Sequence, residues 1–132
     1  MSHSVQEAKI ISGYTSSLTG KHIFGTPDQM STLGLEHAVD EKLQISSQGR
    51  SQGGYYINPL NTNGKFGEYV LFDASAKYQA TKNLSVDFQV RNVFDKVYAS
   101  DVWDEDPNVS TGNAFYFAGA PRSCFVSATI KF

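Results

Sequence analysis

The sequence predicts an all-β fold, an antiparallel up-and-down meander of about six strands. Two observations support this prediction: apolar residues recur at every second position in several stretches, and short connections alternate with long ones. Because successive side chains of a strand point to opposite faces of a sheet, period-two patterns indicate strands with one apolar face. Helical spacing is scarce, so the sequence favours a fold without long helices.

Three stretches alternate clearly and three alternate weakly. In the clearest pattern, other residues, among them Asp73, Lys77 and Gln79, separate Val70, Phe72, Ala74, Ala76 and Tyr78. The next clearest pattern comprises Leu84, Val86, Phe88 and Val90. The stretches are about ten residues long, which is the length that a tilted strand needs to cross a bilayer. The clear stretches are 70–79, 84–91 and 123–132, and the weaker ones are roughly 5–17, 29–39 and 43–53.

The connections between these stretches alternate strictly in length. Residues 40–42 and 81–83 form short turns, whereas residues 18–28, 54–68 and 93–122 form long connections. Outer-membrane barrels have short turns on one side of the membrane and long loops on the other. A soluble meander has no physical reason to keep one end tight and the other end long. The alternation therefore predicts a partial transmembrane β-barrel.

The turn at 81–83 suggests a register in which Ala80 faces Leu84. In that register the apolar residues of the two flanking strands share one face and the charged residues share the other. A slip by one residue would mix the two faces. In the unslipped register Lys77 faces Asp87 and Asp73 faces Arg91, and opposite charges directly across a ladder stabilise a sheet. We expect a charge ladder lining a hydrated barrel interior, made of Asp73, Lys77, Asp87 and Arg91.

Composition excludes several classes of function. The 132-residue chain has a formal net charge of -2 and 18% charged residues, which is not basic enough for a nucleic-acid surface. Its mean hydropathy of -0.32 fits either a soluble protein or a membrane barrel. No apolar run reaches about 18 residues, so a membrane-spanning helix is not expected. Residues 1–9 are polar and lack the apolar core of a secretory signal.

Catalytic and metal-binding patterns are missing from the sequence. Cys124 is the only cysteine, and His3, His22 and His37 are scattered without zinc spacing. We find no nucleophile elbow, P-loop or dinucleotide fingerprint. The sequence therefore predicts a protein that is not an enzyme and carries no cofactor or metal.

Four short segments carry a resemblance to a known family. Residues 91–98 spell Arg-Asn-Val-Phe-Asp-Lys-Val-Tyr, residues 24–27 contain Thr-Pro, residues 13–15 are Gly-Tyr-Thr, and the chain ends on Lys131-Phe132. In this order and spacing they resemble the C-terminal end of TonB-dependent outer-membrane receptors. The family has Asn-Leu-Phe-Asp-Lys-x-Tyr after its penultimate strand and ends on an aromatic residue.

This resemblance implies a barrel of about 22 strands. Residues 1–132 would be its C-terminal portion, with the plug domain and signal peptide absent. It also implies a location in the bacterial outer membrane. The complete receptor would import scarce nutrients, such as ferric siderophores or cobalamin, with TonB-derived energy. The implied partners are outer-membrane lipid and the barrel-assembly machinery. In the complete receptor they also include a plug domain, TonB and a metal-chelate or similar ligand. The charge ladder could contact the plug domain.

The last strand is a candidate assembly signal. In outer-membrane proteins that resemble this one, the barrel-assembly machinery recognises a final aromatic residue with apolar residues at alternating positions. An unpaired edge strand offers free backbone groups for strand addition. The alternative is that these residues simply face lipid. The candidate signal comprises Phe132, Ile130, Ala128, Val126 and Cys124.

The long connections carry candidate ligand contacts. Aromatic and acidic residues there could meet an arriving nutrient. Alternatively, four of the acidic residues could supply the oxygen ligands of a Ca²⁺ site, although their spacing is not that of an EF-hand; they are Asp101, Asp104, Glu105 and Asp106. They could equally be solvated. We expect Phe115, Phe117, Tyr69 and Tyr78 to belong to an interfacial aromatic girdle. The candidate ligand-facing residues are Tyr55, Tyr56, Trp103, Asp104, Glu105, Asp106 and Tyr116.

A small soluble β-barrel that binds a lipid-like ligand is the alternative function. Such a barrel would turn its apolar side chains inward around a cavity. The orientation of Phe72, Phe88 and Ile130 distinguishes the two interpretations, because these side chains would face outward in a receptor piece. For the receptor piece we expect an open, curved and twisted antiparallel sheet.

Overall fold

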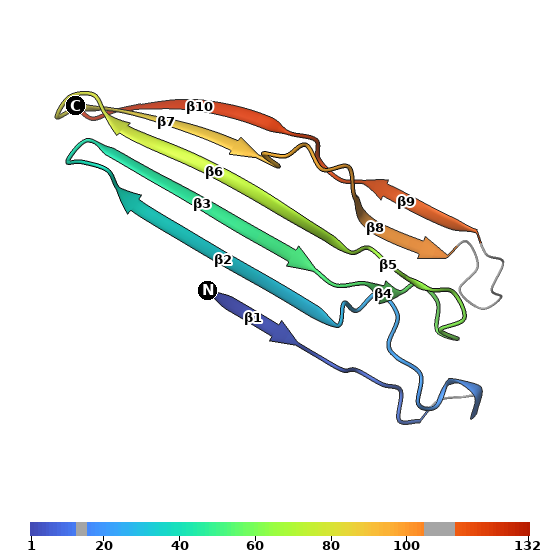
Figure 1. The fold of residues 1–132 in the computed structure, drawn as a ribbon. Coiled ribbons are helices and arrows are strands. Elements are labelled where there is room, and N and C mark those ends of the chain that lie inside the picture. Colours follow the sequence, from blue (N-terminus) through green and yellow to red (C-terminus); the bar gives the residue numbers. More distant parts are fainter. Residues whose placement is uncertain (13–15, 105–112) are drawn as a thin grey trace.

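The computed structural model describes residues 1–12, 16–104 and 113–132, and its centre is one six-stranded antiparallel sheet. The long strands run side by side in a single layer (Figure 1). The predicted all-β meander is therefore confirmed. In spatial order the strands are β1 (Ser2–Val5), β2 (Gln29–Ala38), β3 (Leu43–Gln52), β6 (Tyr69–Gln79), β7 (Leu84–Arg91) and β10 (Ser123–Ile130).

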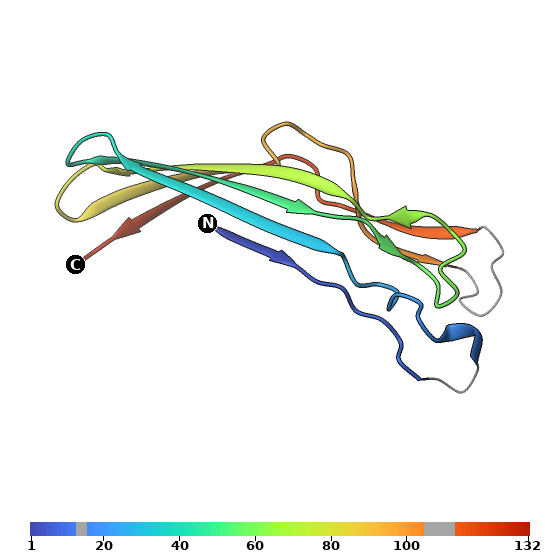
Figure 2. The same cartoon turned by 60° about the horizontal axis from the view of Figure 1, so that its bottom comes forward.

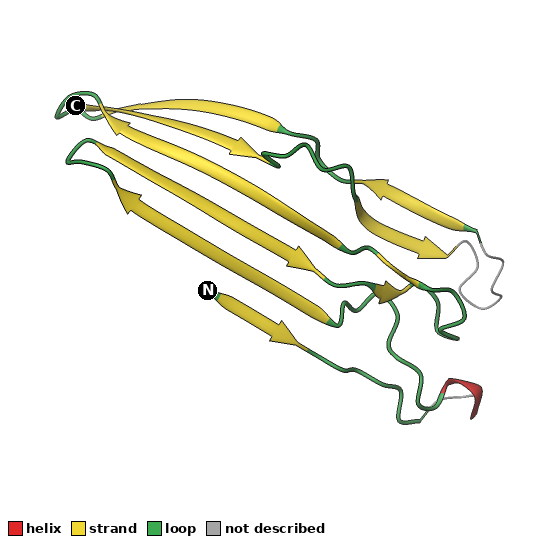
Figure 3. Ribbon diagram, in the orientation of Figure 1, coloured by secondary structure: helices red, strands yellow, loops and turns green. Residues whose placement is uncertain are grey.

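The remaining elements lie at one end of the sheet. Two small hairpins, β4–β5 and β8–β9, lie at one end of the sheet, and the turns that join β2 to β3 and β6 to β7 lie at the other end (Figure 3). Among the described residues, no helix is both long and apolar enough to cross a membrane. The elements outside the six-stranded sheet are η1 (Ser16–Leu18), β4 (Tyr55–Tyr56), β5 (Lys65–Phe66), β8 (Ala99–Asp104) and β9 (Ala114–Ala118).

The short turns are closed by side chains. Asp40 Oδ1 accepts hydrogen bonds from the amides of Lys42 and Leu43 at 2.7 and 2.8 Å. These two hydrogen bonds lower the pKa of the Asp40 carboxyl. At the other turn, Thr81 Oγ1 accepts from the amide of Leu84 at 3.1 Å. Both turns thus use a local side-chain acceptor in place of a backbone acceptor.

The register between β6 and β7 agrees with the prediction. Ala76 lies opposite Phe88, and Lys77 lies opposite Asp87. Each sheet face therefore has its own chemistry, and the polar face carries most of the charged residues of the strands. Its opposite, the apolar face, carries exposed hydrophobic side chains of five strands, namely Leu33, Leu35, Ile45, Val70, Phe72, Tyr78, Phe88, Val126 and Ile130.

The orientation of the apolar side chains contradicts the soluble barrel. Phe72, Phe88 and Ile130 are 45%, 44% and 59% exposed and do not surround an internal cavity. The sheet is open, with β1 and β10 at its two edges. Seen after rotation, it is a thin curved layer rather than a closed cylinder (Figure 2). The alternative of a closed lipid-binding barrel is therefore wrong.

The first strand differs from its prediction. We predicted a strand over residues 5–17, but β1 ends at Val5. The segment that follows still runs beside residues 21–28, through hydrogen bonds from Ile23 N to the Ala8 carbonyl and from Ile10 N to the Lys21 carbonyl. The chain therefore turns back by Lys21, earlier than predicted. The pairing shifts between Val5↔Gln29 and the Lys9↔His22 bridge, which interrupts the regular ladder.

Candidate functional site

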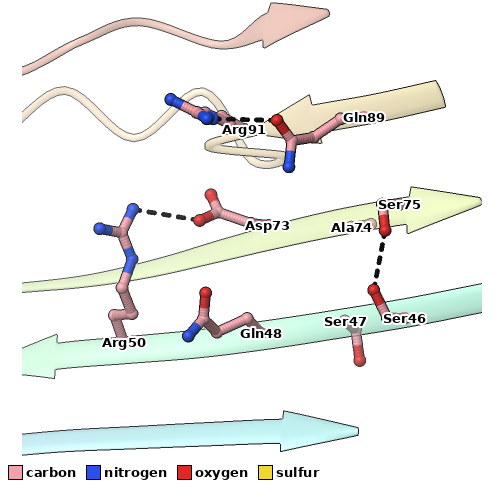
Figure 4. A pocket seen from close by; sticks show the side chains of 9 residues that line it. All are labelled: Ser46, Ser47, Gln48, Arg50, Asp73, Ala74, Ser75, Gln89 and Arg91. Carbon is pink, nitrogen blue, oxygen red and sulfur yellow. Dashed lines mark hydrogen bonds and ion pairs between the residues drawn. The ribbon is translucent and has the colours of Figure 1, made fainter. Parts of the chain in front are cut away.

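The polar face holds a charged groove of about 370 Å³ between β3, β6 and β7 (Figure 4). At its centre, Arg50 Nη2 lies 3.1 Å from Asp73 Oδ2, and only 17% of the Asp73 side chain is exposed. Arg91 also lines the groove; its Nε donates to Gln89 Oε1, and its Cζ lies over the Phe125 ring, 5.2 Å from the ring centroid. The groove is lined by Ser46, Ser47, Gln48, Arg50, Asp73, Ala74, Ser75, Gln89 and Arg91.

The groove corrects part of the predicted charge ladder. The expected Asp73–Arg91 pair is wrong, because the pairing of β6 with β7 ends at Ala74↔Val90 and Asp73 binds Arg50 on the other side. Lys77 and Asp87 do face each other in register, but no ion pair joins them in the described part of the chain. Sequence patterns missed Arg50, whose strand alternates weakly.

Asn92 forms a tight junction where β7 ends. Its side-chain Oδ1 accepts from Lys96 N, and its Nδ2 donates to the carbonyls of Lys96 and Ala120 at 3.0 and 3.1 Å. Asn92 and Asp95 both have positive φ, 51° and 52°, a conformation that Asn and Asp tolerate better than most residues. The Asp95 carboxylate accepts from Arg122 N at 2.9 Å. The segment after β7 is thus fastened to the segment before β10.

The two hairpins pack on each other and form the main buried cluster of the described residues. Tyr55, Ile57 and Val102 make its apolar centre, and each is 3% exposed. The Tyr55 hydroxyl donates to Asp101 Oδ1 at 2.8 Å and accepts from Val102 N at 2.9 Å. Burial, together with the bond to Asp101, raises the pKa of Tyr55 to about 12. This cluster lies outside the six-stranded sheet.

Two of the candidate ligand-facing residues are buried in this cluster. Tyr55 packs inside it, and Asp104 accepts hydrogen bonds from Asn58 and Asn63 at 3.1 and 2.8 Å. The prediction that these two side chains face a ligand is therefore wrong. Their polar groups form hydrogen bonds between the two hairpins. Sequence spacing does not reveal these long-range contacts. The carboxylates of Glu105 and Asp106 lie outside the described residues.

The other ligand-facing candidates remain accessible. Trp103 and Tyr116 are exposed, and Tyr56 is half-buried beneath the Lys65 ammonium, 5.3 Å from its ring centroid. Lys65 also pairs with Asp28, which raises the pKa of Lys65. A cavity of about 560 Å³ adjoins Trp103, and its lining residues are Phe24, Gly25, Ile57, Asp101, Val102, Trp103 and Asp104.

The described residues do not support the calcium alternative. They contain no group of three or more His, Cys, Asp or Glu side chains that could hold a metal ion. Asp101 and Asp104 are both engaged, since Asp101 Oδ2 accepts from Trp103 Nε1 at 2.9 Å and Asp104 accepts from two asparagines. These two carboxylates therefore serve the packing of the hairpins, whereas the other two candidate ligands, Glu105 and Asp106, lie outside the described residues.

Comparison with known proteins decides the family. The family model described as "TonB dependent receptor-like, beta-barrel" matches residues 6–93. The chain belongs to this family. The match covers β2 to β7 and thus the strands that form the charged groove and every strand of the apolar face except β10.

Relatives of this TonB-dependent receptor barrel are siderophore receptors. The ferripyoverdine receptor of Pseudomonas aeruginosa is 42% identical over 57 residues, which are 42% of this chain and 7% of that protein. The ferric-catecholate import receptor Fiu of E. coli K12, in its closed form, has a TM-score of 0.77 and 22% identity over 98% of this chain and 18% of its own. The siderophore receptor PiuA of Acinetobacter baumannii has a TM-score of 0.71 and 24% identity over 86% of this chain and 15% of its own.

The chain spans less than a fifth of the length of these receptors. The two solved structures are below 25% identical to it, so they establish the fold of the sheet and its hairpins. The family consists of receptors rather than enzymes, and it belongs to the bacterial outer membrane.

The family-like segments have distinct places in this TonB-dependent receptor barrel. Residues 91–98 form the Asn92 junction, and residues 24–27 lie between the His22 bridge and β2. The Gly-Tyr-Thr segment, residues 13–15, lies outside the described residues. The last strand, β10, forms one edge of the sheet and exposes Cys124, Val126, Ala128 and Ile130 on the apolar face, while Phe132 follows it fully exposed.

Proposed function

We propose that residues 1–132 are the C-terminal portion of the barrel of an outer-membrane receptor that imports a ferric siderophore or a similar scarce chelate with TonB-derived energy. The two-faced sheet supports this most strongly. Its apolar face exposes side chains that acyl chains can cover, while its polar face carries the Arg50–Asp73 pair that suits a water-filled lumen. The siderophore receptors among its relatives support the ligand class.

The partners follow from this arrangement. Outer-membrane lipid would cover the apolar face, and the barrel-assembly machinery would recognise β10, whose edge offers unpaired backbone groups. The remaining parts of such a receptor, the plug domain and the strands that close the barrel, would meet the polar face and the two edges. TonB would supply energy to the complete receptor.

An uptake experiment tests this proposal. Cells carrying the complete gene, and cells from which it is deleted, are given radioactive iron as ferripyoverdine, a ferric catecholate or ferric citrate. We expect uptake of one of these chelates to require both the gene and TonB. Equal uptake of every chelate with and without the gene would contradict the proposal.

The exposed aromatic residues are the proposed ligand contacts. Tyr56, Trp103 and Tyr116 lie on or beside the two hairpins. Trp103 lies opposite Phe115, so it shares a hairpin face with residues that we place in the interfacial girdle. Alanine variants and lipid quenching separate the two roles. A ligand contact weakens chelate binding when replaced, whereas a girdle residue is quenched by brominated lipid and leaves binding unchanged.

A further inference from the structure

The ion pair on the polar face is joined to the base of the β8–β9 hairpin by consecutive hydrogen bonds. Asp73 uses both of its carboxylate oxygens. Oδ2 binds Arg50 on β3 at 3.1 Å, and Oδ1 accepts from the backbone amide of Asn92 at 2.9 Å. Asp73 therefore connects a groove residue to the residue that directly follows β7.

The Asn92 side chain continues the connection. Lys96, whose amide and carbonyl both bond to it, lies just before β8, and Ala120, whose carbonyl accepts from its Nδ2, lies just after β9. One buried side chain thus ties the strand that leaves the sheet to the strand that returns. A fully hydrogen-bonded buried amide holds both arms of the hairpin at a fixed distance.

The backbone around Asn92 is held in a conformation that needs outside support. Positive φ angles are uncommon at residues other than glycine, although Asn and Asp adopt them more readily than most, and they persist where the surroundings support them. Here two such residues, Asn92 and Asp95, lie three positions apart. Two hydrogen bonds supply that support: Asn92 N donates to Asp73 Oδ1, and Arg122 N donates to Asp95 Oδ1. The junction is therefore sensitive to the position of the Asp73 carboxylate.

We propose that Asn92 is a positioning residue that couples the Arg50–Asp73 ion pair to the β8–β9 hairpin. When Arg50 no longer holds Asp73, the carboxylate turns away from the Asn92 amide and the base of the hairpin loosens. Coupling is reciprocal, so anything that fixes the hairpin also favours the closed ion pair. The role of this coupling in ligand import rests on the proposed function, but the coupling itself does not.

Hydrogen exchange of the complete gene product in detergent micelles, without any chelate, measures the coupling. Arg50→Gln removes the ion pair and touches no residue of the hairpin. We expect amide exchange in residues 99–104 and 114–118 to become about fivefold faster, while the centre of β2–β3 is unchanged. Lys77→Gln is the matched control, because it removes a positive charge from the same face without touching the Asp73 connection.

A double-mutant cycle tests the role of Asn92 itself. Asn92→Gly keeps the positive φ accessible but removes the side chain that joins the two arms. We expect this variant to loosen the hairpin, and Arg50→Gln to add nothing further in its background. Unchanged exchange in Arg50→Gln, an equal effect of Lys77→Gln, or full additivity in the double variant would each overturn the coupling. Because no chelate is present, failure of the import proposal leaves this outcome unaffected.

Discussion

The hydroxyl of Tyr55 donates a 2.8 Å hydrogen bond to Asp101, which lies 46 positions later in the chain. The same hydroxyl accepts from Val102 N, so one phenol binds two consecutive residues of the β8 strand. Gly67 allows this ring to pack closely, because a Cβ at that position would lie 2.3 Å from the Tyr55 ring. The contact holds the β4–β5 and β8–β9 hairpins together at one end of the sheet.

Replacing Tyr55 by phenylalanine should loosen the two hairpins without unfolding the sheet. The ring is retained, but the bonds to Asp101 and Val102 are lost, at a cost of about 1–3 kcal/mol for a buried polar contact. Trp103, the only tryptophan of the chain, reports the change, since its Nε1 donates to the same Asp101 carboxylate. The measurement is denaturant unfolding followed by Trp103 fluorescence. Tyr56→Phe is the matched control, and an equal loss there would argue against the role of the Tyr55 hydroxyl.

The Tyr55 hydroxyl should also make the hairpins sensitive to alkaline pH. Its pKa in the folded protein is about 12, above the ordinary value of 10. Because the folded pKa is raised, the stabilisation is fully present below pH 10, falls as the unfolded form loses its proton above that pH, and is lost as pH passes about 12.

Ultraviolet titration measures this shift directly. The difference in tyrosinate absorbance between the wild type and Tyr55→Phe isolates one tyrosine out of seven. We expect its step near pH 12 in the folded protein and near pH 10 in denaturant. A step near pH 10 under both conditions would contradict the buried, hydrogen-bonded state of this phenol.

The register of β6 and β7 could be predicted from sequence, but the partner of Asp73 could not. Period-two alternation and a three-residue turn fix which residues face each other, and Lys77↔Asp87 follows from them. The partner of Asp73 depends on where β7 stops. That point is set by the left-handed conformation of Asn92 and its tertiary bonds, which leave no periodic pattern.

The hairpin cluster was missed for a related reason. Tyr55 and Asp104 look like exposed aromatic and acidic loop residues in the sequence. Their burial arises from contacts between segments more than forty positions apart, and the strands of β4–β5 are only two residues long. The first strand was misplaced because its alternation is weak and its regular ladder stops at Val5.

Gly119→Ala should destabilise the junction beneath the β8–β9 hairpin. A Cβ at Gly119 would lie 2.3 Å from the Tyr98 ring. The Tyr98 ring also packs against the Tyr69 ring, and the two ring centroids are 4.9 Å apart. The ring cannot move without losing that contact, so we expect a loss of about 1–3 kcal/mol. Gly64→Ala is the control, because a Cβ there meets nothing within 4 Å. Thermal unfolding of both variants measures the difference, and equal stability would refute the tight packing.

Adjacent residues of β10 allow the two faces of the sheet to be tested against each other. Val126 is exposed on the apolar face opposite Phe88, whereas Ser127 lies on the polar face opposite Asp87. A lysine at a lipid-facing position near the bilayer centre costs about 2–4 kcal/mol, while a lysine in the lumen is tolerated. We therefore expect Val126→Lys to lower the free energy of unfolding of the complete gene product in lipid vesicles by about that amount.

Ser127→Lys should leave the same free energy within about 0.5 kcal/mol of the wild type, since the new ammonium would lie beside Asp87. Val126→Thr separates the charge from the loss of an apolar group in the last strand, because threonine has nearly the same shape as valine. If lysine is tolerated equally at both positions, or is worse at Ser127, then the apolar face does not contact acyl chains. If Val126→Thr lowers the free energy of unfolding only slightly and Val126→Lys lowers it strongly, the loss comes from placing a charge in lipid, because threonine keeps the shape of the valine side chain.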